Sequence, residues 1–170
     1  MTSVTTSAVR YTGSSPTTGA ARVRDRASAL SAYLDASAFV KLFLPEPESE
    51  SLNAGLQGHR QLIVSDWTVT EAVSAIARRM REDAIDAAVA ADLYRRMMLS
   101  VDGGYFLRAG SSRTIHREAE RLLMALQADA LRAGDALHLA LALSVDAEAI
   151  VTFDLRLGRA APRLGLQVVP

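Results

Sequence analysis

Four acidic residues stand at positions where a parallel α/β sheet would gather them. Asp35 and Asp154 each follow a short apolar run typical of a buried strand, and Glu71 and Asp135 fall near the starts of helical patterns. Ligands of such sheets bind beyond the carboxyl ends of the strands, where helices also begin. The sequence therefore predicts one acidic site built from four separate segments.

Carboxylates that lie within a few ångströms of one another repel and raise one another's pKa unless a cation lies between them. Oxygen ligands, in a chain without cysteine, favour a hard ion such as Mg²⁺ or Mn²⁺ over zinc. An ion held in this way orients a phosphodiester, activates water for in-line attack and neutralises charge on the attacking and leaving oxygens. The pattern thus indicates metal-dependent hydrolysis of a phosphodiester, with a nucleic-acid backbone as the natural candidate.

Two of the acids also have a simpler explanation. Asp135 in the first turn of a helix would accept orphan backbone N–H groups, and Thr68-Val-Thr-Glu71 fits a capping box with Glu71 at its third helical position. His138 follows Asp135 by three residues on the same helix, and we interpret it as a packing or surface residue rather than as a zinc ligand. These structural alternatives stay open at the level of the sequence.

Composition limits the class of protein. The 170 residues include 19 basic and 19 acidic side chains, so no overall field attracts a polyanion and any nucleic-acid contact must be local. The absence of cysteine excludes disulfides and fits a cytoplasmic protein. No apolar run reaches the roughly 18 residues that a membrane span requires, so we expect a soluble protein.

Arginines and aromatic residues are the candidates for contact with a nucleic acid. Arg132 is the stronger substrate-binding candidate because it lies beside the Asp135 turn, although it could instead pair with an acid of the site. A second group on the Glu71 helix is expected to form a solvated face or to contact phosphate; it comprises Arg78, Arg79 and Arg81. Four aromatic residues are interpreted as core rather than as base-stacking platforms, namely Phe39, Phe43, Trp67 and Tyr94.

Two regions differ in character. Residues 1–29 are rich in Ser, Thr, Gly and Ala, and we expect them to form a disordered leader. An organellar transit peptide or a translation start placed upstream of the true one would explain the same stretch. Residues 30–170 alternate short apolar strands with amphipathic helices, which predicts an α/β domain with a mainly parallel central sheet and helices on both faces.

The elements that position the site follow in order. Strands are expected at 32–34, 62–64, 149–153 and 166–169, with a strand or extended connector at 105–107. Helices are expected from Ala38, over 48–57, from about Ser65 to Met80, from about Asp83 to Leu99, over 113–127 and from Asp135.

Four short motifs occur in a characteristic order. They read Tyr-Leu-Asp35-Ala-Ser37-Ala, Thr-Glu71, Arg-Ala-Gly-Asp135-Ala-Leu-His-Leu-Ala and Val-Thr152-Phe-Asp154-Leu-Arg-Leu. Together they resemble the PIN-domain nucleases, and within these the toxin of VapBC-type toxin–antitoxin pairs. The resemblance covers residues 31–170 and implies a three-layer sandwich with an acidic, Mg²⁺- or Mn²⁺-dependent site that cuts RNA.

The resemblance also implies residue roles. Asp35 and Asp135 would bind the metal directly, and Asp154 would bind it directly or through water. Glu71 would hold a second metal or orient the attacking water. Hydroxyl groups at Ser37 and Thr152 would fix a carboxylate or a metal-bound water.

Partners follow from the same resemblance. Such toxins pair with a small antitoxin that blocks the site, and they commonly form homodimers. Two other hypotheses remain: a nuclease that acts on DNA or processes RNA without an antitoxin, and a binding protein that keeps the fold but does not cut. The leader departs from the usual pattern, in which the first strand begins almost at the N-terminus.

Overall fold

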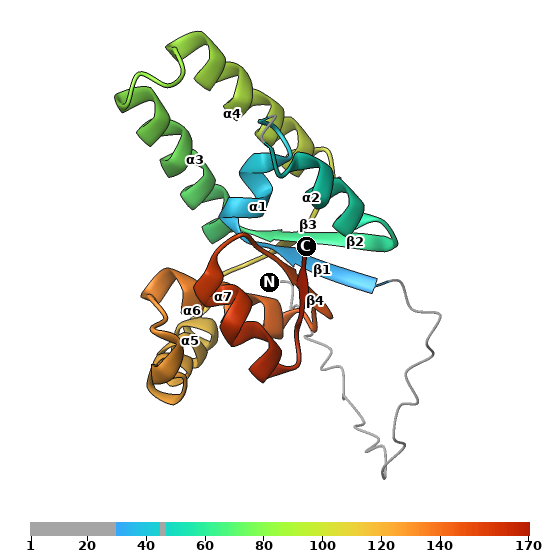
Figure 1. The fold of residues 1–170 in the computed structure, drawn as a ribbon, viewed down its shortest axis with the longest axis vertical. Helices are drawn as coiled ribbons and strands as arrows, with labels where there is room; N and C mark the ends of the chain where they lie inside the picture. Colours follow the sequence, from blue (N-terminus) through green and yellow to red (C-terminus); the bar gives the residue numbers. More distant parts are fainter. Residues whose placement is uncertain (1–29, 45–46) are drawn as a thin grey trace, which may run out of the picture.

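A computed structural model describes residues 30–44 and 47–170, so the predicted leader lies outside the described residues. The described chain forms a five-stranded parallel sheet between two layers of helices (Figure 1). The α/β sandwich predicted from the sequence is confirmed.

The strands are short, and the helices lie between them in sequence. The strands are β1 (Leu30–Leu34), β2 (His59–Ser65), β3 (Leu107–Ala109), β4 (Ala149–Val151) and β5 (Gln167–Val169). The α-helices are α1 (Ala36–Lys41), α2 (Ser49–Leu56), α3 (Asp66–Arg81), α4 (Ala87–Asp102), α5 (Arg113–Ala125), α6 (Ala133–Ser144) and α7 (Leu155–Ala160), and 3₁₀ turns η1 and η2 cover Gln127–Asp129 and Ala161–Leu164. None of the helices in the described residues is long and apolar enough to cross a membrane.

The strand order β3-β2-β1-β4-β5 places β1 at the centre of the sheet. The chain moves outward on one side through β2 and β3, and then returns to the other side of β1 with β4. The direction of winding therefore reverses between β1 and β4. In parallel α/β sheets a crevice forms at this switch point, beyond the carboxyl ends of the two strands.

The central strand β1 supplies both hydrophobic cores. Successive side chains of a strand point to opposite faces of its sheet. Ala32 and Leu34 accordingly pack in a core with α1, α2, α3 and α4, whereas Tyr33 packs with α5, α6 and α7 on the other face. Figure 1 shows the same division, with α3 and α4 extending as a long hairpin on one side and α5, α6 and α7 gathered on the other.

Several predicted boundaries differ from the structure by a few residues, and two of them have a clear physical reason. The helix expected from Asp83 begins at Ala87, because Asp83 has a positive φ of 54° and the side chain of Asp86 caps the helix by accepting the Val89 N–H at 2.8 Å. The connector strand is Leu107–Ala109 rather than 105–107, since its pairing partners are Ile63 to Ser65 of β2. In both cases a local turn or a distant partner decides the boundary.

The aromatic residues divide between core and surface. Phe39 is fully buried, and its ring meets those of Phe43 and Phe106 edge to face at centroid distances of 5.3 Å. Tyr94, by contrast, is 49% exposed on α4, so its assignment to the core is wrong. Helical spacing alone did not distinguish the buried stripe of α4 from its flank.

We expect Phe39→Ala to lower the free energy of unfolding by about 3–5 kcal/mol, because it removes a buried ring and leaves a cavity beside the rings of Phe43 and Phe106. Tyr94→Ala is the matched control and should change it by no more than about 0.5 kcal/mol, as is usual for an exposed side chain. Chemical denaturation of both variants measures the two values, and equal effects would contradict this assignment of core and surface.

Candidate active site

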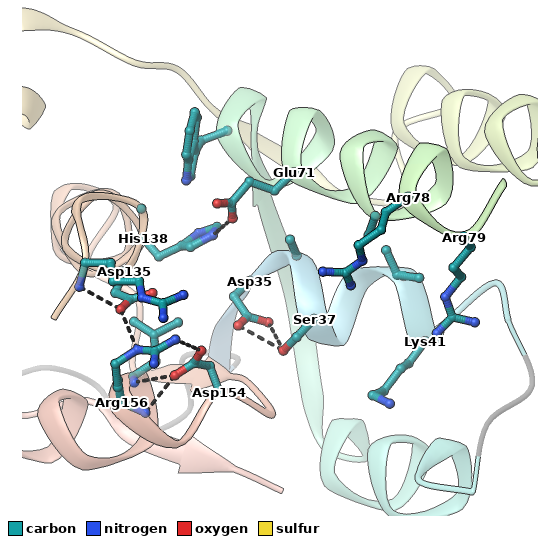
Figure 2. Close-up of a pocket in the computed structure, with 17 residues that line it drawn as sticks. Asp35, Ser37, Lys41, Glu71, Arg78, Arg79, Asp135, His138, Asp154 and Arg156 are labelled. Carbon is teal, nitrogen blue, oxygen red and sulfur yellow. Dashed lines mark hydrogen bonds and ion pairs between the residues drawn. The ribbon is translucent and has the colours of Figure 1, made fainter. Parts of the chain in front are cut away.

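The four predicted acids line one cavity of about 480 Å³ at the carboxyl edge of the sheet. Asp35 comes from the end of β1, Glu71 from α3, Asp135 from the first turn of α6 and Asp154 from the loop after β4. Figure 2 shows Asp135 and Asp154 turned toward Arg156, Glu71 turned toward His138 and Asp35 turned toward Ser37. The cavity lies at the switch point between β1 and β4.

Asp35 is the most buried of the four, with 3% of its surface exposed. It caps α1 by accepting the Ala38 N–H at 2.9 Å. The Ser37 hydroxyl donates to it at 2.8 Å, and the Thr152 hydroxyl donates at 2.6 Å. Both residues expected to fix a carboxylate by their hydroxyl groups therefore contact the same one.

Burial raises the pKa of Asp35, because the charged carboxylate loses hydration at this position. The electrostatic interaction with nearby His138 and the hydrogen bonds just described lower the pKa of Asp35 without cancelling the effect of burial. The ionised form of Asp35 is therefore unfavourable at this buried position, and an added cation would stabilise it.

Asp154 is held by the backbone that follows it. Its carboxylate accepts the N–H of Arg156 at 2.7 Å, and its own N–H donates to the Thr152 hydroxyl oxygen at 2.9 Å. Thr152 thus links Asp154 to Asp35 through one hydroxyl group. The acids at the ends of β1 and β4 are parts of one hydrogen-bonded unit.

Arg156 is a site residue that the sequence analysis did not identify. Its Nε donates to Asp135 at 3.1 Å and its Nη2 donates to Asp154 at 2.9 Å (Figure 2). The hydrogen bond that Arg156 donates to Asp135 and the negative charge of Asp154 raise the pKa of Arg156 further above its ordinary value. The motif Asp154-Leu-Arg contained the signal, but spacing alone does not show that the guanidinium turns back across the cavity.

Glu71 is held by His138, which is also more than a packing residue. His138 is 2% exposed, and its Nε2 donates to the Glu71 carboxylate at 2.7 Å. Its Nδ1 is hydrogen-bonded to the Tyr33 hydroxyl at 2.9 Å, and that hydroxyl also lies 2.8 Å from the Ser65 hydroxyl. A buried polar chain therefore runs from the core to the carboxylate.

The helix-capping explanation is wrong for Glu71 and correct for Asp135. The capping box of α3 is formed by Ser65 and Thr68, so Glu71 lies beyond it and does not cap the helix. Asp135 does cap, since it accepts the Arg132 N–H at 2.8 Å, yet it also lines the cavity. Capping and participation in the site are thus compatible at Asp135.

Gly134 lets α6 approach α3 closely. A Cβ at this position would lie 2.9 Å from Glu71 Oε1 and 3.5 Å from Cζ2 of Trp67. Trp67 packs against the core and also lines the cavity, and its indole N–H has no hydrogen-bond partner in the described part of the chain. A side chain at position 134 would therefore displace the Glu71 carboxylate. Gly134 is the second residue of α6, which begins at Ala133.

Basic side chains border the acids. Arg132 lines the cavity from the start of α6, as expected for a residue beside the Asp135 turn. Arg78, Arg79 and Lys41 line another part of it and lie to one side of the carboxylates in Figure 2. Arg81 is not among the lining residues, so one of the three arginines on α3 belongs to the outer surface.

The donor set fits a hard divalent cation. It offers carboxylate oxygens together with hydroxyls, and Asp135 and Asp154 already converge on one positive group, the guanidinium of Arg156. Among the residues that the structure describes, no three acidic or histidine side chains are close enough to hold a metal in this arrangement. Asp135 and Asp154 meet at the guanidinium of Arg156, whereas Asp35 is hydrogen-bonded to Ser37 and Thr152. Glu71 is hydrogen-bonded to His138.

The fold and the site define a class: a parallel α/β sandwich with an acid-lined cavity at its switch point. Residues 32–162 match the PIN domain, and the chain therefore belongs to the PIN-domain family, a family of nucleases. No protein of curated function matches the chain significantly in sequence.

Several solved structures share the fold. The Mycobacterium tuberculosis toxin VapC20, described as cleaving the sarcin-ricin loop, has a TM-score of 0.64 at 11% identity over 82% of this chain and 99% of that chain. FitAcB from Neisseria gonorrhoeae has a TM-score of 0.59 at 19% identity over 82% and 96% of the two chains. A toxin–antitoxin complex from Klebsiella pneumoniae has a TM-score of 0.58 at 18% identity over 82% and 96%.

We expect His138→Phe to lower the free energy of unfolding by roughly 1–3 kcal/mol, because the ring volume is kept while Glu71 and Tyr33 each lose a hydrogen-bond partner. His116→Phe on the exposed side of α5 is the control and should stay within about 0.5 kcal/mol of the wild type. Urea denaturation provides both values. Indistinguishable variants would show that the buried polar chain contributes nothing to stability.

The pH dependence of stability should reflect Asp35. Because its folded pKa is raised, the folded chain binds more protons than the unfolded chain between the ordinary Asp value of 3.8 and the raised value, so stability falls as the pH rises through this window. In EDTA, Asp35→Asn should therefore melt above the wild type at neutral pH, and the difference should shrink on acidification.

Asp92→Asn is the control, because the pKa shift of Asp92 is opposite in direction to that of Asp35. A hydrogen bond from Arg95 lowers the pKa of this exposed carboxyl, so Asp92→Asn should not raise the melting temperature at neutral pH. Thermal melts between acidic and neutral pH compare the two variants. A lower melting temperature for Asp35→Asn at neutral pH would contradict the expected cost of burying the charge.

Proposed function

We propose that this protein is a Mg²⁺- or Mn²⁺-dependent endoribonuclease and the toxin of a toxin–antitoxin pair. The observation that carries the proposal is the convergence of Asp35, Glu71, Asp135 and Asp154 on one cavity in a PIN-domain chain. A metal bound there would activate water for attack on a phosphodiester and neutralise the charge that develops on the leaving oxygen.

Asp35, Asp135 and Asp154 are the proposed metal ligands. The Ser37 and Thr152 hydroxyls hold Asp35, and backbone N–H groups hold Asp135 and Asp154, so each carboxylate keeps its place without help from a ligand. Such support is what fixes the orientation of metal-binding carboxylates in proteins.

Glu71 is the proposed group that orients the attacking water and accepts its proton. The hydrogen bond from His138 holds its Oε2, while its Oε1 lies near Gly134 at the cavity wall. A general base must be held within hydrogen-bond reach of the proton that it removes. The buried chain through Tyr33 gives His138, and through it Glu71, a fixed position.

The cations that line the cavity suit a polyanionic substrate. Arg132 lies beside Asp135, and Arg78 lies on the other wall together with Arg79 and Lys41. Phosphate contacts from such side chains position a nucleic acid without selecting its sequence. We assign the RNA backbone to this basic border, with Arg132 as the substrate-binding residue nearest the carboxylates.

A protein partner is part of the proposal. Structural neighbours include the toxin–antitoxin complex from Klebsiella pneumoniae and VapBC2 from Rickettsia felis bound to a fragment of promoter DNA. In this chain the α3–α4 hairpin exposes large apolar side chains, as protein-binding surfaces do; they are Met80, Val89, Tyr94 and Leu99. A small antitoxin and a second copy of the chain are the proposed partners, and the cytoplasm is the proposed compartment.

The test is cleavage of a mixed cellular RNA pool by purified protein with Mg²⁺, Mn²⁺ or EDTA. We expect cleavage with either metal and none with EDTA. Asp135→Asn should reduce the rate by roughly a hundredfold or more, since a bound metal lowers such a barrier by several kcal/mol. Sequencing of the cut ends then identifies the target.

Asp102→Asn, at an exposed position on the last turn of α4, is the matched control and should cleave like the wild type. Both variants are first compared with the wild type by circular dichroism to verify folding. Cleavage that survives in EDTA, or that is equal in Asp135→Asn, would contradict the metal-dependent mechanism. Cleavage of DNA instead of RNA, or of neither, would replace the proposal with a DNA nuclease or a silent binding protein.

A further inference from the structure

The guanidinium of Arg156 lies where a cation bound to two of the proposed metal ligands would lie (Figure 2). Its Nε and Nη2 donate to Oδ2 of Asp135 and Oδ2 of Asp154, at 3.1 and 2.9 Å. The two acids are 19 residues apart in sequence and are joined here by one positive group from a third position. The arrangement resembles a cation site whose occupant belongs to the chain itself.

The two carboxylates do not depend on this guanidinium for their positions. Asp135 is tied to the backbone N–H of Arg132 at 2.8 Å, and Asp154 is tied to the backbone N–H of Arg156 at 2.7 Å. If the Arg156 side chain moved away, both carboxylates would stay in place without a counter-charge. Their mutual repulsion would then favour any cation that replaced it.

We propose that Arg156 is an internal counter-cation that a divalent metal ion displaces from Asp135 and Asp154. The inference rests on the proposed function, because it takes these two residues as metal ligands. Mg²⁺ needs ligand oxygens at about 2.0–2.1 Å in near-octahedral directions. Arg156 contacts Oδ2 of both carboxylates, and Oδ1 of Asp154 accepts a backbone N–H. A metal ion bound to the two Oδ2 atoms would therefore exclude the guanidinium.

The side chain of Arg156 has room to leave. It is 28% exposed, so it can extend into solvent without breaking the core. Its backbone stays in the first turn of α7, two residues after Asp154, whichever cation is bound. Competition of this kind multiplies the intrinsic affinity for metal by the fraction of molecules in which Arg156 is not paired with the two carboxylates.

Displacement of Arg156 by metal predicts that one substitution strengthens metal binding and lowers stability in the absence of metal. Arg156→Gln removes the competing cation, so the variant should bind Mn²⁺ about tenfold or more tightly than the wild type, a coupling of ordinary size. The same variant should melt at a lower temperature in EDTA, because Asp135 and Asp154 then face each other without a counter-charge. Saturating Mn²⁺ should remove that deficit. Calorimetric titration and thermal melts measure these effects without RNA.

Arg159→Gln is the matched control, since Arg159 lies exposed on the same helix and does not line the cavity. Its Mn²⁺ affinity should equal that of the wild type. Arg156→Lys keeps the charge, but a single ammonium group does not reproduce the two-nitrogen contact. Its affinity should therefore exceed that of the wild type, and it carries the test if Arg156→Gln does not fold.

A spectroscopic signature checks the displacement directly. The Nε–H resonance of Arg156, assigned by its absence in Arg156→Gln, should shift on titration of the wild type with Mg²⁺ and follow the same binding curve as the metal. The corresponding resonance of Arg159 should not shift. An Arg156 resonance that is unchanged at saturating Mg²⁺ would overturn the proposal.

The outcomes separate this inference from the proposed function. Suppose that the wild type binds Mn²⁺ and cleaves RNA but that Arg156→Gln and Arg156→Lys bind Mn²⁺ no more tightly. The proposed counter-cation role of Arg156 is then wrong, and the proposed ribonuclease activity stands. If the wild type binds Mn²⁺ more weakly than Arg156→Gln but cleaves no RNA, the displacement of Arg156 by metal stands and the proposed ribonuclease activity is wrong. If none of the variants binds Mn²⁺, both the displacement and the metal site are overturned.

Discussion

Repulsion between carboxylates is the constraint on which the site depends. Four acids line one cavity, and three sets of donors hold them. Hydroxyls hold Asp35, a histidine holds Glu71, and backbone N–H groups together with one shared guanidinium hold Asp135 and Asp154. Without such donors, like charges that line one cavity would repel one another. The surrounding fold can therefore be understood as the means of delivering these donors to one edge of the sheet.

The strand order explains how the donors arrive. Because β1 and β4 are neighbours at the switch point, Asp35 and Thr152 meet although 117 residues separate them. The alternation of β1 also matters, since Tyr33 enters the core on the α6 side and reaches His138 there. One central strand thus stabilises the domain on both faces and anchors the polar chain behind Glu71.

The charge pattern of the cavity accounts for a function that the overall composition does not indicate. The chain carries equal numbers of acidic and basic side chains, yet arginines gather around the acidic centre. The basic border suits the phosphates of a nucleic acid, and the acidic centre suits a cation that would neutralise the charge of the reacting phosphodiester. The PIN-domain fold agrees with this arrangement, because its family consists of nucleases.

Local sequence was enough for the class of fold and for placing the four acids around one cavity, because each acid directly follows a buried strand or stands near the start of a helix. Both signals are carried by neighbouring residues. It was not enough for Arg156 and His138, whose contacts depend on which rotamer turns across the cavity and on which helices lie side by side. The exposure of Tyr94 and the start of α4 were missed for the same reason: periodicity places a residue on a face of its helix, while packing decides what covers that face. The sequence by itself thus determined the alternation of elements and the residues at their ends. Only the tertiary structure decided which charges meet, since that choice is made by contacts between segments far apart in the chain.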